Sequence, residues 1–104
     1  MIKHIVMFKV SKADNQFDDN MTRLSRALTD LDGKIPEIKF FEVGRNISNS
    51  PNAADLVLVS EFGNEEELER YREHPEHLKV LELIKEICTE VRVTDYQLPV
   101  HYTC

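Results

Sequence analysis

Hydrophobic and polar residues alternate between residues 2 and 10, and this alternation predicts a β-strand. One face of the strand carries five mostly apolar residues: Ile2, His4, Val6, Phe8 and Val10. The other face is also partly apolar, because Ile5 and Met7 lie there between two lysines. A sheet covered by helices on one side needs only one apolar face, so the second apolar face predicts another subunit and therefore a homodimer.

The next apolar residues have the spacing of a helix, with Asp14 as the expected N-cap. They recur every three or four residues: Phe17, Met21, Leu24, Leu28 and Leu31. Gly33 and Pro36 are expected to end this helix. Glycine tolerates a left-handed C-cap, and proline disfavours a helical conformation for the residue before it.

Three further strands follow from the pattern, over residues 38–47, 55–62 and 91–98. Gly44 is expected to form a bulge in the first of them. The strand over 55–62 is apolar on both faces and is expected to lie in the centre of the sheet.

A break at His74-Pro75 divides the helical region between residues 64 and 88. Asn64, with Glu67 three residues later, predicts a capping box for the first part. Pro75 at the first position of the second part makes His74 its cap and places His77 in the first turn. His77 then shares one helix face with Val80, Leu81 and Ile84, so it is expected to point toward the sheet.

The resulting order is β-α-β-β-α-β. It predicts an α+β, ferredoxin-like fold with four antiparallel strands and helices on one side.

Composition narrows the class of protein. The 104 residues are expected to form one domain over 1–104, and the net charge of −6 makes nucleic acid a poor partner. The chain shows neither a long apolar run nor the pattern of a signal peptide, which predicts a cytoplasmic protein without a membrane partner. Cys88 and Cys104 are expected to be free thiols, as is usual in a reducing compartment.

Several short motifs together resemble the stress-responsive A/B barrel (Dabb) family. They are Lys3-His4-Ile5-Val6, Ile35-Pro36, Tyr71 with His74-Pro75-Glu76-His77, and Asp95-Tyr96. The resemblance implies a ferredoxin-like monomer that pairs with a second copy into a dimeric α/β barrel.

A plant branch of this family, the olivetolic acid cyclases, closes a polyketide by aldol chemistry without a cofactor. Its histidine, tyrosine and general-base histidine resemble His4, Tyr71 and His77 here. The chain departs from that branch after His77, where it has Leu78-Lys79-Val80-Leu81-Glu82-Leu83 in place of the aromatic and glycine residues that line a pocket for an alkyl tail. The resemblance therefore does not specify the substrate.

The chemistry of these residue types fits that role. A histidine in the first turn of a helix is expected to stay neutral and to act as a base, because the positive helix end disfavours its cation. Tyr71 can donate a hydrogen bond to a carbonyl oxygen, and His4 can support either group. The expected substrate-binding residues are Val6, Phe8, Met21, Leu24, Leu58, Leu81, Ile84 and Val93. No cofactor and no metal are expected.

Other interpretations remain open. The two histidines and Tyr71 could form a buried polar network that only stabilises the fold. His74, His77 and His4 could instead bind a metal, although capping should turn His74 away. An enzyme of this type could be cyclase-like or a cofactor-free monooxygenase. A non-catalytic stress-responsive or ligand-binding dimer and a subunit of a larger ring are the alternatives, and a cavity of about 300 Å³ or more beside Tyr71 and His77 would favour the enzyme.

Overall fold

The computed structural model describes residues 1–99 of the chain, so the predictions for Cys104 and the tail lie outside the described residues. The strands are β1 (Ile2–Val10), β2 (Phe40–Arg45), β3 (Leu56–Phe62) and β4 (Cys88–Gln97). The helices are the 3-10 turn η1 (Ala13–Asn15), α1 (Phe17–Thr29), α2 (Glu65–Glu73) and α3 (Pro75–Ile87). This order confirms the predicted ferredoxin-like arrangement, with the second helix divided in two.

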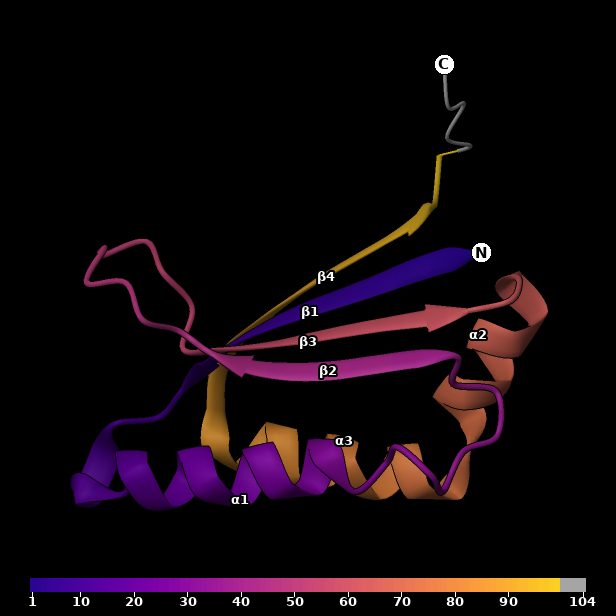
Figure 1. Ribbon diagram of the computed structural model, residues 1–104. Coiled ribbons are helices and arrows are strands. Elements are labelled where there is room, and N and C mark those ends of the chain that lie inside the picture. Colours follow the sequence, from indigo (N-terminus) through magenta and orange to yellow (C-terminus); the bar gives the residue numbers. More distant parts are fainter. Residues whose placement is uncertain (100–104) are drawn as a thin grey trace.

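The four strands form one antiparallel sheet in the order β2-β3-β1-β4. Figure 1 shows α1 and α3 running side by side beneath one face of this sheet, with α2 at one end. The alternation of β1 and β3 places every second residue toward the helices, and these residues are buried. β3 lies between two other strands, as its doubly apolar sequence predicted.

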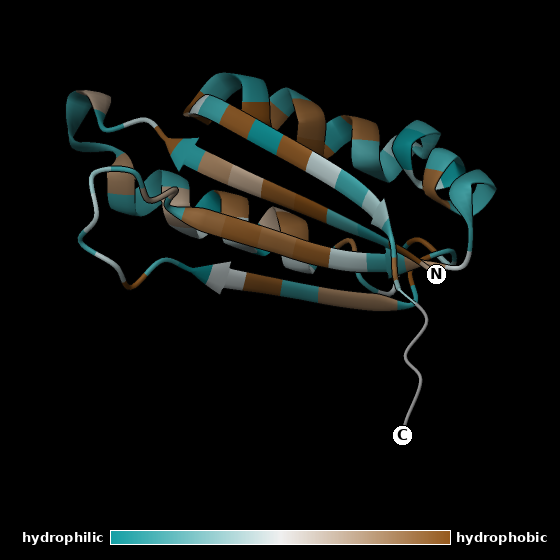
Figure 2. Cartoon of the chain, turned by 90° about the horizontal axis from the view of Figure 1, so that it is seen from above, coloured by the Kyte–Doolittle hydropathy of each residue, from teal (hydrophilic) through white to brown (hydrophobic). Residues whose placement is uncertain are grey.

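The opposite face of the sheet carries no helix (Figure 1). Ile5 and Met7 of β1 pair there with Val59 and Val57 of β3. Figure 2 looks down on the sheet from this side and shows a continuous hydrophobic stretch along β3. Met7 is 44% exposed, so a broad apolar surface remains uncovered in the single chain. We call this surface the open face.

The start of α1 differs from the prediction. Asp14 lies in η1 with a φ of 57°, and α1 begins three residues later at Phe17. An N-cap needs an extended backbone, which a left-handed residue does not have. The apolar stripe itself is correct, because Met21, Leu24 and Leu28 are buried.

The prediction for β2 was too long, and the predicted bulge is wrong. Gly44 pairs in register with Val57, so the strand runs straight through the glycine. The irregular pairing lies instead between Lys9 and Val10 of β1, opposite the start of β4. β4 begins directly where α3 ends, three residues earlier than predicted, and this abrupt entry accounts for the shifted register.

None of the helices within residues 1–99 combines the length and the apolar composition that a bilayer-spanning helix requires. Cys88 is a free thiol, as predicted.

Candidate functional site

The site is built on the junction between α2 and α3. Asn64 caps α2 by accepting a hydrogen bond from the Glu67 N–H at 2.9 Å. His74 has an extended backbone and caps α3, with its Nδ1 accepting from the Glu76 N–H at 3.1 Å. Pro75 occupies the first turn of α3, where no N–H is needed. The predicted break and its two caps are therefore confirmed.

His77 is held by a hydrogen bond across this junction. Its Nδ1 lies 3.0 Å from the backbone carbonyl oxygen of Arg72. A carbonyl oxygen only accepts hydrogen bonds, so Nδ1 carries the proton and Nε2 keeps its lone pair. The ring of His77 also packs against Tyr71, with ring centroids 4.5 Å apart. The fold thus fixes both the orientation and the tautomer of His77.

The environment favours the neutral form of His77. Burial has the largest effect and lowers the pKa of His77. The hydrogen bond to the Arg72 carbonyl comes next and raises the pKa, and the electrostatic effects of nearby His4, Arg72 and His74 lower it. Burial raises the pKa of Tyr71. At neutral pH the imidazole is therefore a free base, and the phenol keeps the proton that it can donate.

His4 joins the same group from the sheet. It is 5% exposed, and its Nδ1 donates to the carboxylate of Asp95, which lies directly opposite on β4. The other carboxylate oxygen of Asp95 accepts from the guanidinium of Arg72. The ring of His4 lies edge-on to Tyr71, with centroids 5.9 Å apart. The structure therefore brings together the three residues that were predicted to act together.

A cavity of about 370 Å³ opens beside these side chains. Its four polar lining residues are His4, Tyr71, Arg72 and His77, and the others are apolar: Val6, Phe8, Leu28, Leu58, Val80, Leu81, Ile84, Val91 and Val93. The cavity lies between the helix side of the sheet and α3. The polar group of an amphiphilic molecule could form hydrogen bonds with these four residues while its apolar part contacts the rest of the lining.

Six of the eight predicted substrate-binding residues line this cavity: Val6, Phe8, Leu58, Leu81, Ile84 and Val93. Met21 and Leu24 do not line it, because they are packed into the core, 5% and 0% exposed. The lining contact of α1 comes from Leu28, one turn further along the same stripe. Helical periodicity identifies the buried face but not which turn reaches a cavity.

The predicted substrate-binding set lacked four residues that also line the cavity: Arg72, Leu28, Val80 and Val91. The alternation of β4 could have identified Val91, because it lies two residues from Val93 on the same face. The sequence analysis already placed Val80 on the helix face of His77 and Ile84, although not among the substrate-binding residues. Arg72 gave no such signal, since a charged residue on an acidic helix is usually solvated.

A metal site finds no support among residues 1–99, where no group of three His, Cys, Asp or Glu side chains is arranged to hold an ion. His74 already uses its Nδ1 to cap α3.

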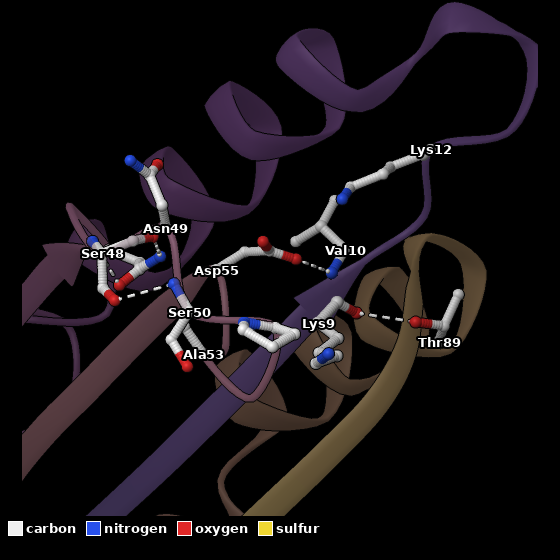
Figure 3. Close-up of a pocket in the computed structure, with 11 residues that line it drawn as sticks. Lys9, Val10, Lys12, Ser48, Asn49, Ser50, Ala53, Asp55 and Thr89 are labelled. Atoms are coloured by element: carbon white, nitrogen blue, oxygen red, sulfur yellow. Dashed lines mark hydrogen bonds between the residues drawn. The ribbon is translucent and has the colours of Figure 1, made fainter.

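A second hollow, of about 560 Å³, lies beyond the other end of β1 and is formed largely by the loop before β3. Figure 3 shows its lining, which is mainly polar and includes Lys9, Lys12 and Asp55. The carboxylate of Asp55 accepts from the Val10 N–H at 2.8 Å, and the Thr89 hydroxyl donates to the Lys9 carbonyl at 3.4 Å (Figure 3). We call this the loop hollow.

Comparison with known proteins identifies the family. Residues 2–98 match the sequence model of the Stress responsive A/B Barrel Domain, Dabb. Uncharacterized protein SCO4036 of Streptomyces coelicolor is 33% identical over 97 residues, which are 93% of this chain and 99% of that protein.

Two crystal structures of dimeric ferredoxin-like proteins of unknown function have the same fold. The protein from Bacteroides fragilis is 29% identical, with a TM-score of 0.82 over 93% of this chain and 95% of that chain. The protein from Thermobifida fusca is 24% identical, with a TM-score of 0.82 over 93% of this chain and 90% of that chain. The chain belongs to the stress-responsive A/B barrel family.

Proposed function

We propose that this protein is a small-molecule enzyme that removes a proton from the carbon beside a carbonyl group, as in a cyclase-like aldol closure. The hydrogen bond between His77 Nδ1 and the Arg72 carbonyl carries the proposal. It leaves Nε2 as the basic nitrogen of a side chain that lines an apolar cavity together with Tyr71. The base and the hydrogen-bond donor are thus neighbours in a site that excludes much of the water.

The proton transfer can be followed atom by atom. Nε2 of His77 takes the proton from carbon, the electron pair of the broken C–H bond forms the C=C bond of the enolate, and the carbonyl π pair moves onto the oxygen. The Tyr71 hydroxyl donates a hydrogen bond to that oxygen as its negative charge grows. The enolate can then attack a second carbonyl of the same molecule, and His77 returns the proton to the new alkoxide. The sequence of steps needs no oxidant and no cofactor.

The cavity indicates the class of substrate. A volume of about 370 Å³ lies at the lower end of the usual range of ligand pockets, about 300 to 1,000 Å³, so the substrate is small. Most of the lining is aliphatic or aromatic, which favours a molecule with an apolar body. A polyketide-like compound with a short alkyl tail has both the carbonyl groups and the apolar surface that this site requires.

Hydrogen exchange tests the proposal without knowledge of the natural substrate. A panel of alkyl methyl ketones and alkyl β-keto esters is incubated with the protein in deuterated buffer, and loss of the α-proton signal is followed by NMR. We expect catalysed exchange, and we expect His77→Ala to reduce it by about 10² to 10⁴-fold, the usual contribution of a positioned base. Lys85→Ala on the exposed face of α3 is the matched control. Equal exchange by the His77→Ala and native proteins would refute the proposal.

The same apolar cavity also supports the second candidate, a non-catalytic ligand-binding protein of stress responses. That role predicts saturable binding of the ketones by calorimetry together with no catalysed exchange. It also predicts that His77→Ala lowers the free energy of unfolding by about 1 to 3 kcal/mol, because the variant breaks a polar network. The monooxygenase alternative stays a prediction, and consumption of dioxygen in the presence of a phenol would test it.

We further propose that the chain forms a homodimer, a dimeric α/β barrel, through its open face. The uncovered apolar residues of β1 and β3 support this, as does the dimeric state of the Bacteroides fragilis relative. A stable interface of this type buries more than about 1,000 Å². Val57→Glu should yield a monomer by light scattering, whereas Lys85→Ala should remain a dimer, and a monomeric native protein at micromolar concentration would contradict the proposal. The cytoplasmic location stays a prediction.

A further inference from the structure

Arg72 is linked to both histidines of the site, directly to His77 and through Asp95 to His4. Its backbone carbonyl accepts the hydrogen bond from His77 Nδ1 at 3.0 Å. Its guanidinium binds the carboxylate of Asp95, and the other oxygen of that carboxylate accepts from His4 Nδ1. One residue at the end of α2 is therefore connected to a histidine on α3 and to a histidine on β1.

The connection to His4 passes through the edge of the sheet. Asp95 lies on β4, which pairs on one side only, and its register places it opposite His4. A carboxylate on an exposed edge strand has rotamer freedom unless a second partner holds it. Arg72 supplies that partner, and the planar guanidinium fixes the orientation of the carboxylate more strictly than a lysine could.

Arg72 also stands in the wall of the cavity. It lines the cavity of His77 on one side, and on the other it lines a hollow of about 320 Å³ together with Glu65, Glu69 and Asp95. Glu69 is its second carboxylate partner, at 3.2 Å from the guanidinium. The ion pair with Asp95 thus joins the end of α2 to β4 at the boundary between an apolar cavity and a polar hollow.

We propose that Arg72 is a positioning residue that holds both histidines in the tautomer with a free Nε2. Its side chain orients Asp95, which fixes the proton of His4 on Nδ1. The same ion pair anchors the last turn of α2 to the sheet, which keeps the Arg72 carbonyl in place for His77 Nδ1. The effect on catalysis rests on the proposed function, whereas the effect on the two tautomers does not.

Nitrogen NMR of the imidazole rings tests this directly. In the native protein at pH 8, the ¹⁵N shifts should show His4 and His77 with the proton on Nδ1. Arg72→Ala should turn His4 into a mixture of tautomers, because Asp95 loses its anchor, and Arg72→Lys should restore the native pattern only in part. A native tautomer pattern for His4 in Arg72→Ala would overturn the proposal.

Arg70, two residues earlier on the same helix, provides a matched control. Its guanidinium pairs with Glu37 at 3.3 Å and takes no part in the hydrogen bonds that hold the two histidines of the site. Arg70→Ala removes a comparable exposed ion pair, so it should leave both tautomers unchanged. Exposed ion pairs contribute little to stability, and both arginine variants should unfold at nearly the native temperature. Tautomer changes of equal size in Arg70→Ala would show a general loosening of α2 and would also overturn the proposal.

The exchange assay adds a second readout. Misplacement of a catalytic group by about 1 Å can cost about 10²-fold in rate, so Arg72→Ala should lower kcat about 10 to 100-fold and leave KM nearly unchanged. If His77→Ala has no effect on exchange while the tautomers respond to Arg72→Ala, the proposed function fails and the positioning role stands. If His77→Ala abolishes exchange while Arg72→Ala changes neither tautomers nor kcat, only the positioning role fails.

Discussion

The cavity beside His77 and the loop hollow are both lined by residues of β1, but the cavity is mainly apolar and the loop hollow is mainly polar. The cavity takes His4, Val6 and Phe8 from the helix side of the strand, whereas the loop hollow takes the end of the strand at Lys9 and Val10. The loop hollow is the larger, at about 560 Å³ against about 370 Å³. Its greater volume is not accompanied by an arrangement suited to catalysis.

The difference lies in how the polar groups are used. In the loop hollow they bond to one another and to nearby backbone, as with Asn46 and Ser48, which exchange hydrogen bonds at 2.8 and 3.0 Å. In the cavity, Nδ1 of each histidine is held by a hydrogen bond, to Asp95 for His4 and to Arg72 for His77, so the other nitrogen stays available. A half-satisfied side chain against an apolar lining is a better indication of chemistry than volume alone.

Removing the phenol should have the largest effect among the tests of this comparison. Tyr71→Phe keeps the ring that packs on Phe62 and His77 but loses the hydroxyl donor. Loss of a donor to a developing oxyanion typically costs about 10² to 10³-fold in rate, and we expect about 10²-fold here by the exchange assay. An unchanged rate would mean that the oxygen finds its donor elsewhere.

A tryptophan introduced into the cavity or into the loop hollow should affect ligand binding differently. Ile84→Trp fills part of the cavity, and a ligand that must displace the added ring at a cost of about 1 to 3 kcal/mol should bind about 5 to 150-fold more weakly. Ala53→Trp adds the same ring to the loop hollow and should leave ketone binding unchanged. Calorimetry on both variants, with thermal unfolding to verify their folds, measures the contrast. Weaker binding in Ala53→Trp would contradict the assignment of the site.

The pH dependence should reveal the base. In the proposed mechanism the neutral form of His77 is the active one, and burial lowers the pKa of His77 below the usual value of about 6.5. The rate of exchange should therefore stay level from pH 8 to below 6.5 and then fall about tenfold per pH unit. His77→Ala should lack this acidic limb. A limb above pH 6.5 in the native protein would point to another group.

The smallest effect on activity is expected in the loop hollow. Asp55→Ala removes the acceptor of the Val10 N–H, and an unsatisfied backbone donor costs about 1 to 3 kcal/mol of unfolding free energy. Chemical denaturation should show that loss, while the exchange rate stays native. A fall in exchange at full folding would extend the functional site to the loop hollow.

The order of elements could be predicted from the sequence because it depends on local patterns. Alternation identified β1 and β3, and the pair His74-Pro75 identified the break that aims His77. The start of α1 was missed, because the left-handed backbone at Asp14 and Asn15 has no signature in the hydrophobic pattern.

The histidines and Tyr71 could be chosen in advance, but the contacts between them could not. The link from Arg72 through Asp95 to His4 joins residues on three elements, and the spacing of these residues along the chain does not predict it. Likewise, the periodicity of α1 could not distinguish Leu28, which reaches the cavity, from Met21 and Leu24, which do not. Local sequence patterns predict which face of a helix or strand is buried, whereas a site depends on which of these faces pack against one another in the fold.

The fixed start of α3 has a consequence for how such a protein can diverge. His74 and Pro75 set where the helix begins, and His77 follows within the first turn. Val80, Leu81 and Ile84 line the cavity from later turns of the same helix. Substitutions at these later positions can reshape the cavity while His77 keeps its place and its tautomer. The junction thus fixes the position of His77 independently of the residues that shape the cavity, so the lining can change without moving the histidine.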